Sequence, residues 1–288
     1  MDIGIQLYSV KGMIDQDHVS ALRKVANVGY KNWEVCQLYG RNDVAYNYGL
    51  QMPPDEARGF IEELGVKVIG SHLTDEQIRD EAYLEEYLEY MERIGCKAAG
   101  LGAAFFPYMD MNALKETIAR FNRVGERCKA HGMRFYYHNH FQEFQYFGNK
   151  TVYDLLVEGT DPSLVWFELD TYWAMRGGQD PVTLLNKHGK RICFIHQKDF
   201  PRDFRSPANL YSYAISQTKN LDFGALRGIN EPDAFTEVGK GCMDIAGIFK
   251  AADQAGVEYA ILEQDRTQLT ELESITTSYE AISVLLKK

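Results

Sequence analysis

The sequence predicts an α/β protein with a single (β/α)8 (TIM) barrel domain over residues 1–288, and three observations support this prediction. Segments with strand character alternate with segments of helical spacing eight times along the chain. Each strand and helix unit takes about 30 to 40 residues, which suits a barrel of this length. No G-x-G-x-x-G motif follows the first strand, and this disfavours the main alternative, a doubly wound open sheet.

Local signals mark the elements of the first half of the chain. The helix after the first strand ends at Gly29, because glycine commonly follows the last helical residue. Proline and acidic residues at 53–56 open the next helix, since the first turn tolerates proline and favours negative charge. Thr74 precedes two acidic residues that open a long helix. The expected elements are strands 2–8, 31–36, 66–72 and 97–102 and helices 17–28, 53–64, 74–94 and 111–130.

The second half repeats the same alternation. A His131-Gly132 pair ends a helix, and the aromatic residues of 135–137 then favour a strand. If that strand continues through residue 140, its period of two places His138 and His140 on one face. The expected elements are strands 133–140, 164–170, 191–199 and 257–265 and helices 152–158, 180–188, 244–255 and 272–285.

One long irregular region, 200–241, interrupts the alternation after the seventh strand. It exceeds the usual length of a connection, which favours a lid over the site or a contact between copies in a homo-oligomer. Gly239 and Gly241 near its end form either a tight turn before the next helix or a cradle for a phosphate group.

Composition restricts the partners. A formal net charge of −10 and a pI near 5.3 disfavour a nucleic-acid partner, whose phosphates need a basic footprint, whereas a small neutral or metal-chelated ligand is compatible. The five cysteines are odd in number and have no C-x-x-C spacing, which indicates a reducing compartment. Neither a signal peptide nor 18 consecutive apolar residues occur, so we expect a soluble cytoplasmic protein without a membrane partner.

Polar side chains collect where the expected strands end. In a closed parallel barrel these ends surround one shared cavity. Four of the seven histidines lie there, whereas His18, His131 and His188 lie at helix ends and are assigned structural roles. Carboxylates mixed with imidazoles suit Mn²⁺, Mg²⁺, Co²⁺ or Zn²⁺. The strand-end residues are Glu34, His72, His138, His140, Glu143, Glu168, Asp170, His196, Lys198, Glu263 and Asp265.

Five segments resemble the xylose-isomerase-like TIM-barrel superfamily, and within it bacterial sugar phosphate isomerases/epimerases related to inosose dehydratases and 3-keto sugar enzymes. The segments are YHNHFQEF, FELDTYWAMRGGQDP, FIHQKDF, VGKGCMD and AGVEYAILEQD. The resemblance implies one divalent metal ion held by Glu143, Asp170, His196 and Glu263. Many relatives carry Glu where this chain has His138, so either Glu143 or His138 supplies the ligand after the fifth strand.

The implied chemistry is proton transfer beside a carbonyl. A divalent ion that chelates two adjacent sugar oxygens stabilises an enediolate. The acid/base candidates are His138, His140 and Lys198, with Glu143 and Glu263 as alternatives. Depending on where the proton returns, or whether a β-hydroxyl leaves, the same residues epimerise, isomerise or dehydrate a sugar, keto sugar or inositol derivative.

Four residues are expected to contact the carbohydrate: Glu34, His72, Glu168 and Trp173. Alternatively, Glu168 is a partner buried deeper in the barrel, Trp173 packs the barrel rim, and Lys198 forms an ion pair with Asp199. Two other functions remain open from the sequence. One is a non-catalytic barrel subunit or scaffold, although a scaffold does not need metal ligands. The other is a metal-dependent endonuclease, which the charge of −10 opposes.

Overall fold

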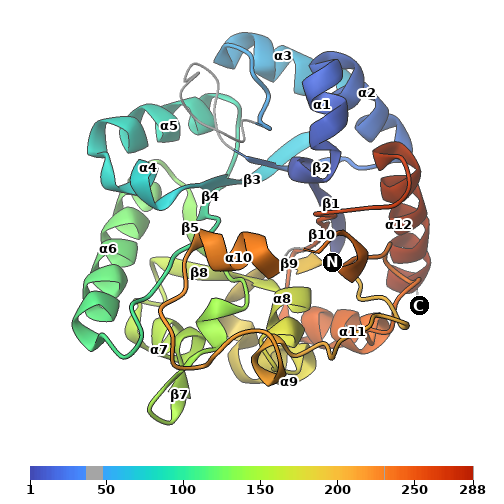
Figure 1. Cartoon of the computed structure of the whole chain (residues 1–288). Helices are drawn as coiled ribbons and strands as arrows, with labels where there is room; N and C mark the ends of the chain where they lie inside the picture. The colour runs from blue at the N-terminus through green and yellow to red at the C-terminus, as the bar shows by residue number, and fades with distance from the viewer. Residues whose placement is uncertain (37–47, 230, 288) are drawn as a thin grey trace.

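The protein is a closed barrel of eight parallel strands, in a computed structural model that describes residues 1–36, 48–229 and 231–287. Neighbouring strands follow the order β1-β10-β9-β8-β5-β4-β3-β2, and helices surround the ring (Figure 1). The prediction of a (β/α)8 barrel is therefore confirmed. The barrel strands are β1 (Asp2–Gln6), β2 (Asn32–Cys36), β3 (Lys67–Leu73), β4 (Ala98–Leu101), β5 (Arg134–His138), β8 (Val165–Asp170), β9 (Ile192–Gln197) and β10 (Tyr259–Leu262).

The outer layer consists of helices whose apolar faces pack against the barrel wall. A short hairpin of β6 (Tyr146–Phe147) and β7 (Lys150–Thr151) lies outside the barrel. The helices are α1 (Lys11–Gln16), α2 (His18–Val28), α3 (Pro54–Leu64), α4 (Asp75–Arg79), α5 (Glu81–Arg93), α6 (Met111–Ala130), α7 (Val152–Gly159), α8 (Thr171–Arg176), α9 (Pro181–His188), α10 (Phe223–Ile229), α11 (Ile245–Ala255) and α12 (Glu271–Leu286).

The interior of the barrel is filled by a small cluster that includes Tyr136 and Phe194. The ring of Tyr136 lies directly over the backbone of Gly100, where an added Cβ would overlap it, so the close approach requires glycine. The Tyr136 hydroxyl donates to the carboxylate of Glu34. This packing separates the closed bottom of the barrel from the polar residues above it.

Five expected elements, one helix and four strands, differ from the structure. The expected helix 74–94 is two helices, because Asp80 is extended and its side chain accepts from Tyr83 N to begin α5. The first strand ends at Gln6 and continues into a short 3-10 helix, Leu7–Val10. The fifth, seventh and eighth strands end at 138, 197 and 262, so His140, Lys198 and Glu263 lie just beyond them.

The region 200–241 contains more regular structure than expected. Its described part includes α10 and two short 3-10 helices, Leu210–Ser212 and Pro232–Ala234. In Figure 1, α10 crosses the middle of the ring of strands. The region is tied to the barrel, since Tyr172 Oη donates to Ala234 O at 2.8 Å and Tyr211 Oη donates to Phe141 O at 3.1 Å.

Two further expectations concern the whole chain. All five cysteines are free thiols. Within the described ranges, no helix combines the length and the apolar character that a membrane crossing demands.

Candidate active site

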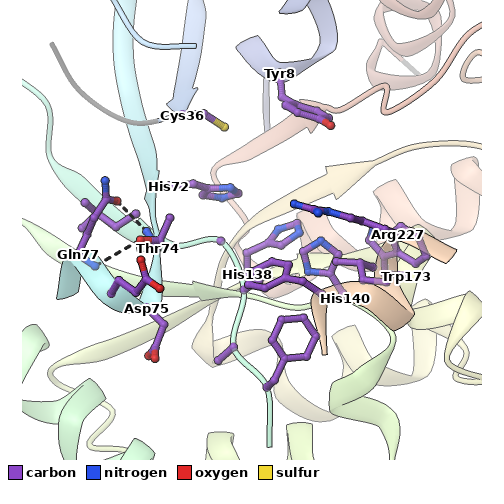
Figure 2. Close-up of a pocket in the computed structure, with 18 of the residues that line it drawn as sticks. Tyr8, Cys36, His72, Thr74, Asp75, Gln77, His138, His140, Trp173 and Arg227 are labelled. Carbon is purple, nitrogen blue, oxygen red and sulfur yellow. Dashed lines mark hydrogen bonds between the residues drawn. The ribbon is translucent and has the colours of Figure 1, made fainter. Parts of the chain in front are cut away.

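A cavity of about 830 Å³ lies at the C-terminal ends of the strands. Strand-end residues form its floor, and Trp173 and Tyr8 line it from the adjacent segments (Figure 2). One side wall comes from α4 and from residues 102–105. Among the residues singled out in the sequence, those that line the cavity are His72, His138, His140, Trp173, Glu263 and Asp265.

Helix α10 covers the cavity. Phe223, Leu226 and Arg227 line it from this helix, and the ring of Phe223 packs edge-on against Phe105 with centroids 4.6 Å apart. Figure 2 shows Arg227 extending toward His140 and Trp173. These cover residues were not predictable individually from the sequence, because they lie in a region without strand-end periodicity.

Asp199 holds both ends of the covering region. Its carboxylate accepts four backbone N–H groups, from Phe200 and Met243 at Oδ1 (2.9 and 3.1 Å) and from Gly239 and Gly241 at Oδ2 (3.0 and 2.9 Å). The N–H groups of the two glycines that could have cradled a phosphate therefore bind an internal carboxylate. The structure favours the tight turn, and it gives Asp199 a partner other than Lys198.

Four buried side chains at the floor of the cavity form a group that could hold a metal ion. Ligand atoms of His138, Asp170, His196 and Glu263 all lie within 4.8 Å of one another. Asp170 also begins α8, because its side chain accepts from Trp173 N at 2.7 Å. Two carboxylates and two imidazoles are a donor set that divalent first-row metals accept, so these residues fit the implied ion.

Lys198 lies beside this group and is completely buried. Its ammonium donates to Asp170 and to Glu263, and Asp265 Oδ2 is 3.8 Å away. Burial tends to raise the pKa of Glu263, but the charges of Lys198 and His196 outweigh it and hold that pKa well below its usual range. Lys198 does not line the cavity, so its contacts are with the carboxylates.

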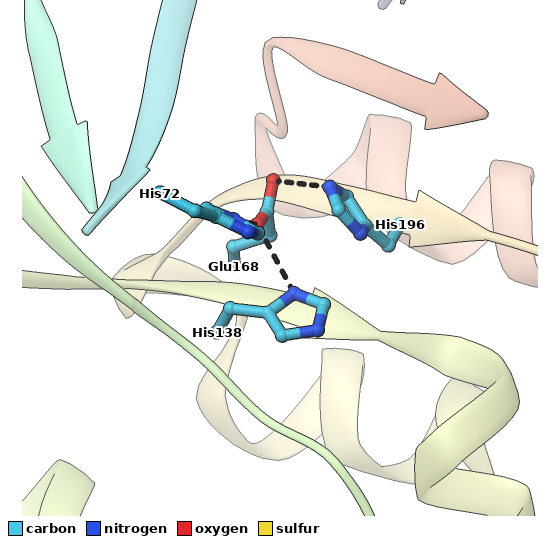
Figure 3. A group of neighbouring side chains, drawn as sticks. All are labelled: His72, His138, Glu168 and His196. Atoms are coloured by element: carbon cyan, nitrogen blue, oxygen red, sulfur yellow. Dashed lines mark hydrogen bonds and ion pairs between the residues drawn. The ribbon is translucent and has the colours of Figure 1, made fainter. Parts of the chain in front are cut away.

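A second group lies below the first and shares two of its histidines. It consists of His72, His138, Glu168 and His196 (Figure 3). Glu168 Oε2 accepts from His72 Nε2 at 2.8 Å and from His138 Nδ1 at 3.1 Å. His196 Nε2 is 3.1 Å from Glu168 Oε1, but its hydrogen bond goes to Glu34 Oε2 at 2.6 Å. Glu34 and Glu168 have no exposed surface and do not line the cavity.

The four strand-end histidines divide into two electrostatic classes. Burial lowers the pKa of His72, but the charge of Glu34 and a hydrogen bond to Glu168 outweigh it and raise the pKa to about 10. The pKa of His196 is also raised well above its usual range, since the surrounding carboxylates overcome its burial. Burial lowers the pKa of His138, and burial together with Lys198 lowers that of His140 to about 3. At neutral pH the last two are therefore uncharged.

Glu143, the other candidate ligand after the fifth strand, lies outside both groups. Its carboxylate accepts from the Tyr137 hydroxyl, from His140 N at 2.9 Å and from Gln142 Nε2 at 3.2 Å. Burial raises its pKa to about 7. In this structure His138 thus occupies the place beside Asp170, and Glu143 fixes the backbone that carries His140.

The fold and the buried group define a TIM-barrel protein with a polar, metal-compatible cavity at the strand ends. The profile described as xylose isomerase-like TIM barrel matches residues 22–287, and the chain belongs to this family. It is 30% identical over 213 residues to an inosose dehydratase from Clostridium beijerinckii, an alignment that covers 72% of this chain and 61% of the relative.

Two solved structures share the fold of this chain. A sugar phosphate isomerase/epimerase from Parabacteroides distasonis aligns with a TM-score of 0.71 and 25% identity over 98% of this chain and 97% of that one. The IolI protein, solved with a bound zinc atom, aligns with a TM-score of 0.73 and 16% identity over 100% and 98%. Because the identity to IolI is only 16%, this second similarity concerns the fold alone.

Proposed function

We propose that this protein is a divalent-metal-dependent enzyme that isomerises, epimerises or dehydrates a sugar, keto sugar or inositol derivative. The observation that carries the proposal is the buried group of His138, Asp170, His196 and Glu263 at the floor of the covered cavity. The similarity to an inosose dehydratase supports a keto-polyol as the substrate type.

The four residues of this group would hold the ion, and a divalent ion bound there supplies a Lewis acid that polarises a substrate carbonyl. Lys198 donates to two of the carboxylates, Asp170 and Glu263, and holds them in place. We assign Lys198 to this contact and not to direct proton transfer, because it does not line the cavity.

His140 is the base that the cavity offers for the C–H beside the carbonyl. It lines the cavity, its pKa of about 3 keeps it uncharged, and its Nδ1 is buried without a hydrogen-bond partner among the described residues. Its ring lies 5.6 Å from that of Trp173, whose flat face suits the apolar side of a sugar ring. Glu143 sets its position through the backbone N–H.

Helix α10 would exclude water from the reacting centre. Its residues Phe223 and Leu226 are apolar and form the outer side of the cavity. Excluding water protects a reactive enediolate and strengthens the electrostatic interactions inside. We therefore retain the role of a lid for the region 200–241.

The cavity wall opposes the endonuclease alternative. Asp75, Glu76 and Asp80 line it, whereas Arg227 is the one lysine or arginine among the described lining residues. A phosphodiester backbone would meet more negative than positive charge there.

Deuterium exchange tests the proposed function. Keto sugars and keto-inositols are incubated with the metal-loaded protein in D₂O, and deuterium is measured at the carbon beside the carbonyl. We expect incorporation with the parent, and none with Asp170→Ala or after removal of metal by a chelator. His188→Gln, at a buried histidine of α9 that contacts Asp154 and does not line the cavity, serves as a control. Absence of exchange with every keto compound would refute the proposed chemistry.

A further inference from the structure

Each candidate histidine ligand has one ring nitrogen bound to a carboxylate deeper in the barrel. For His138, Nδ1 lies 3.1 Å from Glu168 Oε2, and the opposite nitrogen, Nε2, faces Asp170 Oδ2 at 3.9 Å. His196 uses the two ring nitrogens the other way round, with Nε2 and not Nδ1 toward the deeper carboxylate. Its Nε2 lies 2.6 Å from Glu34 Oε2, and its Nδ1 faces Glu263 Oε2 at 3.0 Å.

A third histidine joins the two deep carboxylates. His72 Nε2 is 3.2 Å from Glu34 Oε1 and 2.8 Å from Glu168 Oε2. The ring centroid of His72 is 4.9 Å from that of His138 and 5.4 Å from that of His196. The layer thus connects β2, β3 and β8 directly below the two imidazoles that would bind the ion.

The floor of this layer is also fixed by hydrogen bonds. Glu34 accepts from Gln6 Nε2 at 2.8 Å and from the hydroxyl of Tyr136. Neither Glu34 nor Glu168 lines the cavity, so they cannot touch a substrate there. Their contacts in the described part of the chain are with the histidines and with these polar groups.

The chemistry of imidazole explains what the layer of Glu34, His72 and Glu168 can do. A histidine that binds a metal through one nitrogen keeps a proton on the other, and a carboxylate that accepts this proton fixes the tautomer and the ring orientation. Glu168 selects the proton on Nδ1 of His138, whereas Glu34 selects the proton on Nε2 of His196. The lone pairs that would bind an ion then belong to the two nitrogens that face Asp170 and Glu263.

We propose that Glu34, His72 and Glu168 are positioning residues that set the ring tautomers of His138 and His196, and that the four-residue group around Glu168 is not a second metal site. The proposal rests on the proposed metal-binding function. An ion in the lower group would need Nδ1 of His138 and Nε2 of His196, the nitrogens that the deep carboxylates hold. The two groups therefore compete for the same two imidazoles, and together these described residues bind a single ion.

The test measures Zn²⁺ affinity by chelator competition, Zn²⁺ stoichiometry, and ring tautomers by ¹⁵N NMR of histidine-labelled protein. We expect one Zn²⁺ per chain, held through Nε2 of His138 and Nδ1 of His196. Glu168→Gln and Glu34→Gln should each bind Zn²⁺ about 10- to 100-fold more weakly. The ¹⁵N signals of His138 in the first variant, and of His196 in the second, should show a changed tautomer.

Matched controls separate the two proposals. Asp154→Asn alters another buried carboxylate that binds a histidine, with His188 Nε2 at 2.7 Å, and should leave Zn²⁺ affinity unchanged. If Asp170→Ala binds Zn²⁺ as tightly as the parent, the proposed metal site is wrong. If Asp170→Ala loses Zn²⁺ while both deep variants retain parental affinity and tautomers, the positioning role is wrong. Two ions per chain, one of them lost in His72→Gln, would likewise overturn the inference.

Discussion

Asp199 ties the two ends of the covering region together, and we expect Asp199→Asn to weaken this connection. The aspartate accepts four backbone N–H groups at 2.9 to 3.1 Å, two at each oxygen. Asparagine keeps one oxygen, and its NH₂ group faces the other two N–H donors. Loss of two hydrogen bonds to a charged acceptor costs about 3 kcal/mol even at about 1.5 kcal/mol each.

This loss acts locally, because the bonds tie residue 200 to residues 239–243. About 3 kcal/mol raises the population of the open state roughly 100-fold. Hydrogen exchange followed by mass spectrometry should therefore show about 100-fold faster exchange in protected amides of 200–243. Asp203→Asn, an exposed aspartate of the same region, is the matched control. Equal exchange in the two variants, within about threefold, would refute the reasoning.

Three further predictions concern packing, pH and proton transfer. Gly100→Ala forces a Cβ into the ring of Tyr136 and should lower the free energy of unfolding by about 1 to 3 kcal/mol in urea titrations, whereas no loss would contradict the packing argument. Burial lowers the pKa of His131, but hydrogen bonds to Glu85 and Glu92 outweigh it and raise that pKa overall. The contribution of the protonated His131 to stability is therefore complete below pH about 6.5 and is lost as the pH rises through the raised pKa. The stability difference between the parent and His131→Gln should therefore shrink from pH 6 to pH 9, by about 1 kcal/mol at most, and a difference that grows would reverse the assignment. His140→Asn should keep its metal while turnover falls about 100-fold or more, and parental turnover would remove His140 as the base.

Elements with local signals were predictable from the sequence. The expected helix 111–130 matches α6, because Asp110 caps its start and the His131-Gly132 pair ends it. The expected helix 74–94 was wrong at Asp80, since its apolar stripe continues across a residue that instead caps the next helix. Whether a side chain caps a helix or continues it depends on its local backbone conformation, which periodicity does not report.

The convergence of Asp170, His196 and Glu263 was predictable, because strand parity and barrel closure are enough to bring strand ends together. The deep carboxylates were not predictable as partners of histidines. Glu168 and His72 are 96 residues apart, and their contact depends on the register of the closed barrel. Glu143 follows the fifth strand as expected, but the Tyr137 hydroxyl and the turn after β5 hold it away from the group.

The central claim is that Asp170, His196 and Glu263, with His138, hold one divalent ion at the floor of the cavity. Metal content measured by mass spectrometry on protein purified without chelators tests it most directly, with alanine variants at the first three positions and circular dichroism to confirm that each variant folds. The account predicts one ion per chain in the parent and a strong loss in each variant. Parental metal content in any two of the three variants would contradict it.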